Sequence, residues 1–183
     1  MPMNKLLIEF LEMLDFSRTE VEELYPDWAA TIDLLGLEEQ DVRFAKEEWI
    51  PQHWDISIKG VRLCIGAYIR ELIEIGKIKK YKERGIKVIY GISPSQPPCY
   101  SAIKIAGGEK VAVMYPDFLL SIVLGGFFNK LSLFTEDDSL LSERCRHCAL
   151  NRTRINSSVR QVIPEPDVIW TWKLFCDEAA KTE

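Results

Sequence analysis

The amino-acid sequence predicts an α/β fold in which an N-terminal helical arm is followed by a parallel sheet with flanking helices. Three observations lead to this prediction. Up to residue 84, apolar side chains recur at helical spacing in segments bounded by prolines and glycines. After Gly85, short runs rich in β-branched residues alternate with helical patterns. This alternation is typical of parallel sheets, whose helical connections pack on the two faces.

Composition and charge narrow the classes of function. With 183 residues, 47% hydrophobic and 28% charged, the chain can bury a core and is typical of a globular protein. Its net charge of -5 argues against nucleic acid as the main partner, because phosphate binding needs a basic face. No segment resembles a signal peptide. The longest apolar-rich run, 118–128, is shorter than the roughly 20 residues that span a bilayer. We therefore expect a cytoplasmic protein that does not bind membranes.

The helical arm is expected to occupy residues 1–84. We predict a first helix over 3–14, a second that is capped by Ser17 and ends before Pro26, a third over 29–35, and a fourth over 38–49. Ser17 with Glu20 three residues later forms a capping-box pattern. The prolines at 26 and 51 are expected to stop the second and fourth helices.

One long helix is predicted over 58–84, with Ser57 as its N-cap and Gly85 at its end. Its last turns, 77–84, carry many cations where the helix macrodipole favours them. We interpret this basic segment as a solvated helix terminus. Binding of an acidic partner or a nucleotide phosphate is the alternative.

The α/β part is expected to occupy residues 85–183 and to be truncated at its C-terminal end. Buried strands are predicted over 86–90, 110–115 and 167–172, with helices over 100–106 and from Pro116 onward. This order of elements predicts a Rossmann-like parallel sheet. Such sheets bind ligands at the carboxyl ends of their strands.

The loop after the first strand lies on that predicted ligand edge. Its Ser93, Ser95 and Gln96 offer two hydroxyls and an amide to a substrate, while its prolines stiffen the backbone. The loop lacks the glycine spacing of a dinucleotide-binding or phosphate-binding motif. A rigid turn without a ligand is the alternative interpretation.

Cysteines carry the clearest chemical signal. Five are present, and three of them lie near the C-terminus: Cys145 and Cys148 in a Cys-x-x-Cys step, and Cys176 beyond the third strand. In a reducing compartment, clustered thiols are more often metal ligands or redox groups than disulfides. The spacing is poor for a four-ligand zinc site, whereas three thiolates suit a 4Fe-4S cluster with one open iron. Cys64 and Cys99 are interpreted as core or helix-facing residues.

Three segments, in their order, resemble the 2-hydroxyacyl-CoA dehydratase and benzoyl-CoA reductase family. Residues 87–107 look like its opening strand, proline-bearing loop and following helix. Cys148 with Arg152 four positions later resembles its first cluster cysteine and the basic residue that comes after it. Residues 166–177 resemble the strand that leads to its second cluster cysteine, here Cys176.

The resemblance implies an iron-sulfur subunit in which Cys148 and Cys176 are cluster ligands and the loop with Ser93, Ser95 and Gln96 lies near an acyl-CoA thioester. In the family, an ATP-hydrolysing activator protein delivers single electrons to the cluster, and the substrate passes through a ketyl radical. The resemblance also implies a homologous partner subunit or a homodimer. No catalytic side chain is assigned.

The sequence leaves more than one interpretation of which residue is the third cluster ligand. The family's third cysteine belongs to a C-terminal half, so we expect the chain to be the N-terminal part of a longer subunit and to be inactive in isolation. Alternatively, Cys145 is the third ligand, or it marks the double-cubane branch of the family, which reduces small molecules. Two other hypotheses are a non-catalytic α/β binding or assembly module, with or without zinc, and a fold in which the three thiols never converge.

Overall fold

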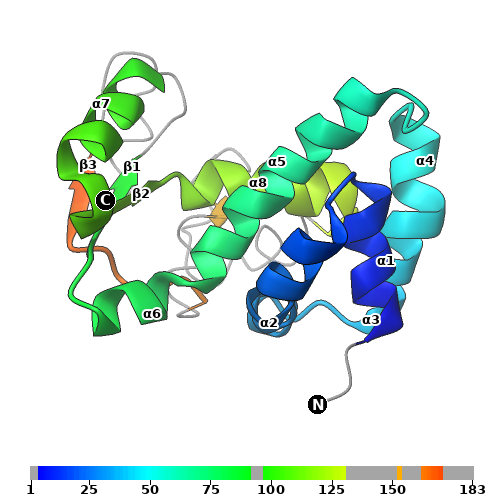
Figure 1. The fold of residues 1–183 in the computed structure, drawn as a ribbon, viewed down its shortest axis with the longest axis horizontal. Coiled ribbons are helices and arrows are strands. Elements are labelled where there is room, and N and C mark those ends of the chain that lie inside the picture. Colours follow the sequence, from blue (N-terminus) through cyan, green and yellow to red (C-terminus); the bar gives the residue numbers. More distant parts are fainter. Residues whose placement is uncertain (1–3, 92–96, 131–151, 154–161, 171–183) are drawn as a thin grey trace, which may run out of the picture. The chain divides into compact units, whose positions relative to one another are not determined.

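A computed structural model describes residues 4–91, 97–130, 152–153 and 162–170 (Figure 1). The chain forms two compact units, residues 1–77 with 123–130, and residues 78–122 with 131–183. The described residues are mostly helical and contain a three-stranded parallel sheet flanked by helices, and the N-terminal helices precede this sheet. The α/β prediction is therefore confirmed. The domain limits of 1–84 and 85–183 remain a prediction.

The first unit begins with the predicted helix, α1 (Lys5–Met13), whose N-terminus is capped by Asn4. Its apolar face buries Leu6, Leu7, Phe10 and Leu11. The aromatic ring of Phe10 stacks at 5.6 Å both on Trp28 and on Phe128. These three rings form the centre of the core of this unit.

The second helix, α2 (Arg18–Leu34), passes through Pro26, so the prediction that it ends there was wrong. Pro26 lacks an amide hydrogen for the helix ladder, which costs about 3 kcal/mol in a helix interior. Buried side chains on both sides of the proline, Val21 before it and Trp28 after it, hold the two halves in one helix. Their burial stabilises the helix by about 1.5–3 kcal/mol for each large apolar side chain. The predicted capping box of Ser17 and Glu20 is confirmed.

Pro51 likewise does not stop the next helix, contrary to the prediction. The chain runs without a break through α3 (Glu39–Phe44), the π-helical turn η1 (Ala45–Trp49) and α4 (Ile50–His53). A π-helical turn bonds each amide to the carbonyl five residues back, and this wider ring accommodates an inserted proline. The fully buried Ile50 anchors the turn in the core.

The helix predicted over 58–84 is interrupted, and the structure forms α5 (Lys59–Gly76) and α6 (Ile78–Glu83) instead. At Gly76 the backbone lies so close to Thr31 of α2 that a Cβ atom would overlap the threonine hydroxyl. The amide of Lys77 then turns to the carbonyls of Glu74 and Ile75, which ends α5. Ser57 is not the N-cap either, because its hydroxyl donates to Asp55 at 2.6 Å and Ile58 occupies the cap position.

The end of helix α8 (Pro116–Phe127) completes the first unit, which includes residues 123–130. The indole nitrogens of Trp49 and Trp54 both donate to the carbonyl of Gly126, at 3.0 and 3.2 Å. Lys130 forms an ion pair of 2.8 Å with the buried carboxylate of Asp41. Asn129 adopts a left-handed conformation (φ 52°), as expected for a residue just beyond a helix end.

The second unit contains the sheet. Its described strands and the elements between them are β1 (Lys87–Gly91), α7 (Pro97–Gly107), the 3-10 turn η2 (Gly108–Lys110), β2 (Val111–Met114), α8 (Pro116–Phe127) and β3 (Val168–Trp170). The strand order is β2-β1-β3 and all pairs are parallel. The three strand predictions and the start of α8 at Pro116 are confirmed. The helix predicted over 100–106 begins earlier, at Pro97, since proline suits the first helical turn.

Burial differs along the sheet. Val88 and Tyr90 of β1 are buried, and so are Val113 and Met114 of β2. Val168 and Ile169 of β3 are exposed, so the prediction of a third buried strand was wrong for these residues. Among the described strands β3 pairs only with β1 and therefore forms an edge. No described helix is long and apolar enough to span a bilayer.

Candidate functional site

Strand order determines where a ligand site can form in this sheet. The central strand β1 pairs with β2 on one side and with β3 on the other. The chain leaves β1 toward β2 on one side and later returns to the other side of β1 as β3, so the strand order changes direction at β1, and its carboxyl end is the candidate switch point. In open parallel sheets, ligands bind in the crevice at such a point. The candidate site is this carboxyl edge.

The register identifies the residues from which the site-forming segments start. Gly91, the last residue of β1, is the partner of Trp170, the last residue of β3. The sequence continues from Gly91 toward Ser93, Ser95 and Gln96, and from Trp170 toward Cys176. Two segments that are far apart in the sequence thus start side by side at one edge. The four polar residues themselves lie outside the described part of the chain.

An aromatic pair borders the two strand ends on the β2 side. Tyr115 comes directly after β2, and its ring lies so close to Gly91 that a Cβ atom there would overlap it. The ring of Tyr100, in α7, lies 5.2 Å from that of Tyr115. The ammonium group of Lys104 lies 5.6 Å from the centre of the Tyr100 ring. A glycine at the last position of β1 is therefore required by the packing of Tyr115.

This aromatic pair is not among the site residues predicted from the sequence. Tyr115 stands at a strand end and Tyr100 at a helix start, and both positions are typical of residues that border a ligand site in a parallel sheet. A tyrosine at the last position of the predicted strand 110–115 was the available signal. The contact with Gly91 depends on the tertiary structure.

The opposite, amino edge is held by Asp167, which precedes β3. Its carboxylate accepts hydrogen bonds from the backbone amide of Val88 at 2.8 Å and from the ammonium group of Lys87 at 3.1 Å. The Val88 amide, with a smaller contribution from Lys87, holds the pKa of Asp167 below its usual value. This edge fixes β3 in register and has no part in the candidate site.

Tyr90 provides a second anchor within the sheet. Its hydroxyl donates to the carbonyl of Pro164 at 2.6 Å. Burial raises the pKa of Tyr90 above its ordinary value, so the phenol stays protonated at physiological pH. Its role is therefore to hold the connection before β3.

The predicted metal ligands Cys145, Cys148 and Cys176 all lie outside the described residues. The nearest described part of that segment is Arg152 with Thr153, four and five positions after Cys148. Thr153 is fully buried, and its hydroxyl oxygen lies 3.1 Å from that of Ser121 on α8. The chain shortly after Cys148 is thus attached to the helix that comes after β2.

Two cysteines lie within the described ranges. Both were interpreted as core or helix-facing residues; Cys64 is exposed on α5 and so is not a core residue, and Cys99 in α7 is half-buried. Residues 4–91, 97–130, 152–153 and 162–170 contain no group of three or more histidine, cysteine or acidic side chains that could hold a metal ion.

Comparison of the chain with protein-family models, with curated proteins and with solved structures finds no match.

Proposed function

We propose that this chain is part of the iron-sulfur subunit of an ATP-dependent low-potential reductase or 2-hydroxyacyl-CoA dehydratase, a cytoplasmic enzyme that passes single electrons from a cluster to its substrate. The resemblance of three ordered segments to the dehydratase and reductase family suggests this activity. One structural observation carries the proposal, namely the parallel pairing of β1 with β3 that aligns Gly91 with Trp170.

This pairing supports the proposal because it aligns the starts of two segments with complementary chemistry. Ser93, Ser95 and Gln96 come shortly after Gly91, and Cys176 comes six positions after Trp170. A thiolate donor and a group of polar side chains are thus connected to neighbouring strand ends. Thiolates are the ligands that iron-sulfur clusters require, so the chemistry of these donors fits a cluster.

In this proposal, Cys148 and Cys176 hold the cluster, and Cys145 or a cysteine beyond this chain supplies a third thiolate. When bound, the cluster supplies a low-potential electron at an iron with an open coordination position. Ser93, Ser95 and Gln96 bind and orient the acyl-CoA or other small substrate by hydrogen bonds. The rings of Tyr115 and Tyr100 exclude water from the β2 side of the site.

The proposed partners are an ATP-hydrolysing activator protein, which delivers the electron, and a homologous subunit or a second copy of the chain. Both are implied by the family resemblance. The direct test is the colour and metal content of protein purified without oxygen. A broad brown visible absorbance with iron and acid-labile sulfide supports the proposal. Colourless protein with zinc, or without metal after anaerobic iron reconstitution, supports the alternative of a non-catalytic α/β module.

A further inference from the structure

Charged side chains are almost absent from the segment that forms the candidate edge. Residues 88–108 include most of β1 and all of α7, and their only charged side chain is Lys104, although 28% of the chain is charged. Ligand sites are lined mainly by apolar and aromatic side chains, and a few polar groups orient the ligand. A single cation in such a segment therefore determines which charge the edge attracts.

The first turn of α7 lies at the carboxyl end of the sheet. Its Tyr100 packs on Tyr115, which comes directly after β2. Helical side chains lean toward the N-terminus of their helix. The ammonium group of Lys104 accordingly lies 5.6 Å from the centre of the Tyr100 ring, although Lys104 comes one turn later in α7. The charge of Lys104 is thus directed toward the candidate edge.

A series of ring contacts connects this ammonium group to the end of β1. The Tyr100 ring lies 5.2 Å from the Tyr115 ring, and the Tyr115 ring packs against Gly91, the last residue of β1. Both tyrosines are half-buried, whereas Lys104 is exposed. The two rings therefore form a packed support for a cation that solvent and ligands can reach.

The charge of Lys104 is available to a ligand. In the part of the chain that the structure describes, no carboxylate forms an ion pair with this lysine. Lys87, at the opposite edge, differs because it pairs with Asp167 at 3.1 Å. An ammonium group has three donor hydrogens, and a ring contact occupies one side of the group. We propose that Lys104 binds an anionic oxygen group of the substrate, a phosphate or a carboxylate, and so makes the candidate edge selective for anionic substrates.

This role of Lys104 rests on the proposed function, because it requires that a substrate enters at the carboxyl edge. The substrate-binding residues predicted there, Ser93, Ser95 and Gln96, are neutral, so they orient a ligand by hydrogen bonds without recognising its charge. Lysine supplies a compact charge with three donors, which suits phosphate and carboxylate oxygens. Attraction between opposite charges is stronger in partly apolar surroundings than in water. Lys104 thus adds a selectivity for charge that the three neutral residues lack.

The first experiment is isothermal titration calorimetry of the full chain with three probes. Coenzyme A carries phosphates, pantetheine is the same thiol arm without phosphates, and succinate carries carboxylates. Lys104→Gln should raise the dissociation constant of an anionic probe at least ~10-fold and leave pantetheine binding unchanged. An effect on coenzyme A identifies phosphate as the group that binds, and an effect on succinate identifies a carboxylate. Binding of neither anion, or equal binding of the anions by the wild type and the variant, overturns the proposal.

Two further variants test whether the position of the charge matters. Lys104→Arg retains the charge and should bind the anionic probe more tightly than Lys104→Gln does. Lys110→Gln is the matched control, because Lys110 is also exposed and lies directly before β2, at the amino edge of the sheet. This control should bind the anionic probe like the wild type. Equal weakening by Lys104→Gln and Lys110→Gln indicates a general effect of net charge and contradicts the proposal.

Iron content distinguishes failure of this proposal from failure of the proposed function. Lys104→Gln should bind as much iron as the wild type after anaerobic reconstitution, because the variant changes no thiol. A chain that binds an anionic probe through Lys104 but holds no iron contradicts the cluster and supports the role of Lys104. A chain that holds iron but binds the anionic probes equally with and without Lys104 contradicts the role of Lys104 alone.

Discussion

Asp167 and Val88 form two hydrogen bonds with each other where β3 begins. The amide of Val88 donates to the Asp167 carboxylate at 2.8 Å, and the amide of Asp167 donates to the Val88 carbonyl, also at 2.8 Å. One residue thus aligns the start of β3 with β1. This register brings Gly91 and Trp170 together at the other end of the two strands.

Asp167→Ala should therefore loosen β3. The carboxylate has a lowered pKa, so its contribution to stability is complete above its unfolded pKa and is lost as pH falls through the lower folded value. We expect faster hydrogen exchange of the β1 and β3 amides in the variant at pH 7 and a smaller difference from the wild type near pH 3. Glu165→Ala, which removes a nearby exposed carboxylate, is the control. Equal effects of the two variants would argue against the anchoring role.

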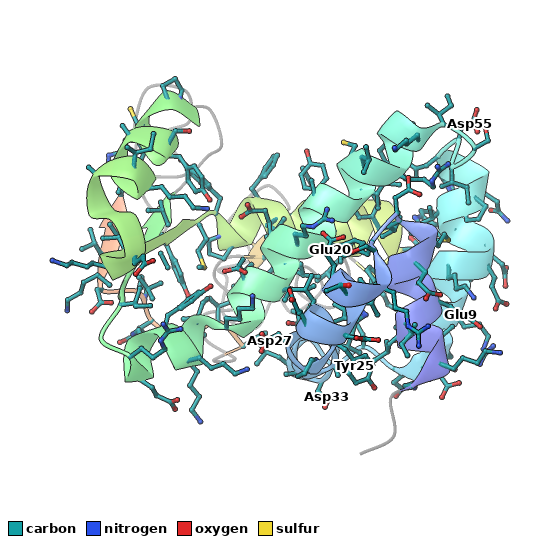
Figure 2. The ribbon with its side chains drawn as sticks, viewed as in Figure 1. Glu9, Glu20, Tyr25, Asp27, Asp33 and Asp55 are labelled. Carbon is teal, nitrogen blue, oxygen red and sulfur yellow. The ribbon has the colours of Figure 1, made fainter. Side chains whose placement is uncertain are left out.

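The start of α2 gives a second pH-dependent prediction. Glu20, labelled in Figure 2, accepts from the amide of Ser17 at 2.8 Å and from its hydroxyl at 2.8 Å, and it pairs with Arg70 of α5 at 2.9 Å. These contacts, the Ser17 amide first, lower the pKa of Glu20 from 4.5 to about 2. The stabilisation is thus full above pH 4.5 and disappears as pH falls toward 2.

Ser17→Ala removes the side-chain cap of α2. It should lower the free energy of unfolding by about 1 kcal/mol at pH 7. Urea denaturation monitored by circular dichroism measures this change, and Thr19→Ala at an exposed neighbouring position is the control. The two variants should differ most at pH 7 and less near pH 2, because the bond from the Ser17 hydroxyl to the Glu20 carboxylate is lost on protonation while the bond from the Glu20 amide to that hydroxyl remains. A difference that does not change with pH would contradict the role given to Glu20.

Gly76 allows α5 to approach α2. Gly76→Ala should lower the free energy of unfolding by about 1–3 kcal/mol, because the new methyl group overlaps the hydroxyl of Thr31. That hydroxyl is fixed by its donation to the carbonyl of Asp27 at 2.7 Å. Thr31→Ala in the same chain should recover part of the loss. Gly60→Ala, where no atom lies within 4 Å, should be neutral or slightly stabilising.

These predictions also show which features local sequence can and cannot reveal. The strands and their connecting helices were predictable because β-branched runs, glycines and Pro116 determine the backbone conformation of the few residues around them. The continuation of α2 through Pro26 could not be predicted from local sequence, because it depends on the packing of Trp28 against Phe10 of another helix. The break after Gly76 depends in the same way on a distant residue, Thr31.

The candidate site was predictable to a similar degree. The order of strands, loop and cysteines in the sequence suffices to predict a ligand edge. The contact of Tyr115 with Gly91 is not predictable from sequence, because it requires the pairing of β1 with β2. The positions of Ser93, Cys148 and Cys176 remain predictions, since these residues lie outside the described part of the chain.

Gly91→Ala tests the packing of the site. The methyl group would displace the ring of Tyr115, at a cost of about 1–3 kcal/mol. We expect lower thermal stability and, if the carboxyl edge holds the cluster, less iron per chain after anaerobic reconstitution. Tyr115→Ala combined with Gly91→Ala should recover stability, because it removes the overlapping ring. A single variant with wild-type stability would contradict the close packing.

The central claim is that thiolates at the carboxyl edge hold an iron-sulfur cluster. Its most direct measurement is the iron and acid-labile sulfide content of the anaerobically reconstituted full-length subunit. Cys148→Ser and Cys176→Ser should each lose most of the iron, whereas Cys64→Ser, which alters an exposed cysteine of α5, should retain it. Absence of bound iron, or iron content that is equal in all three variants, would contradict the account.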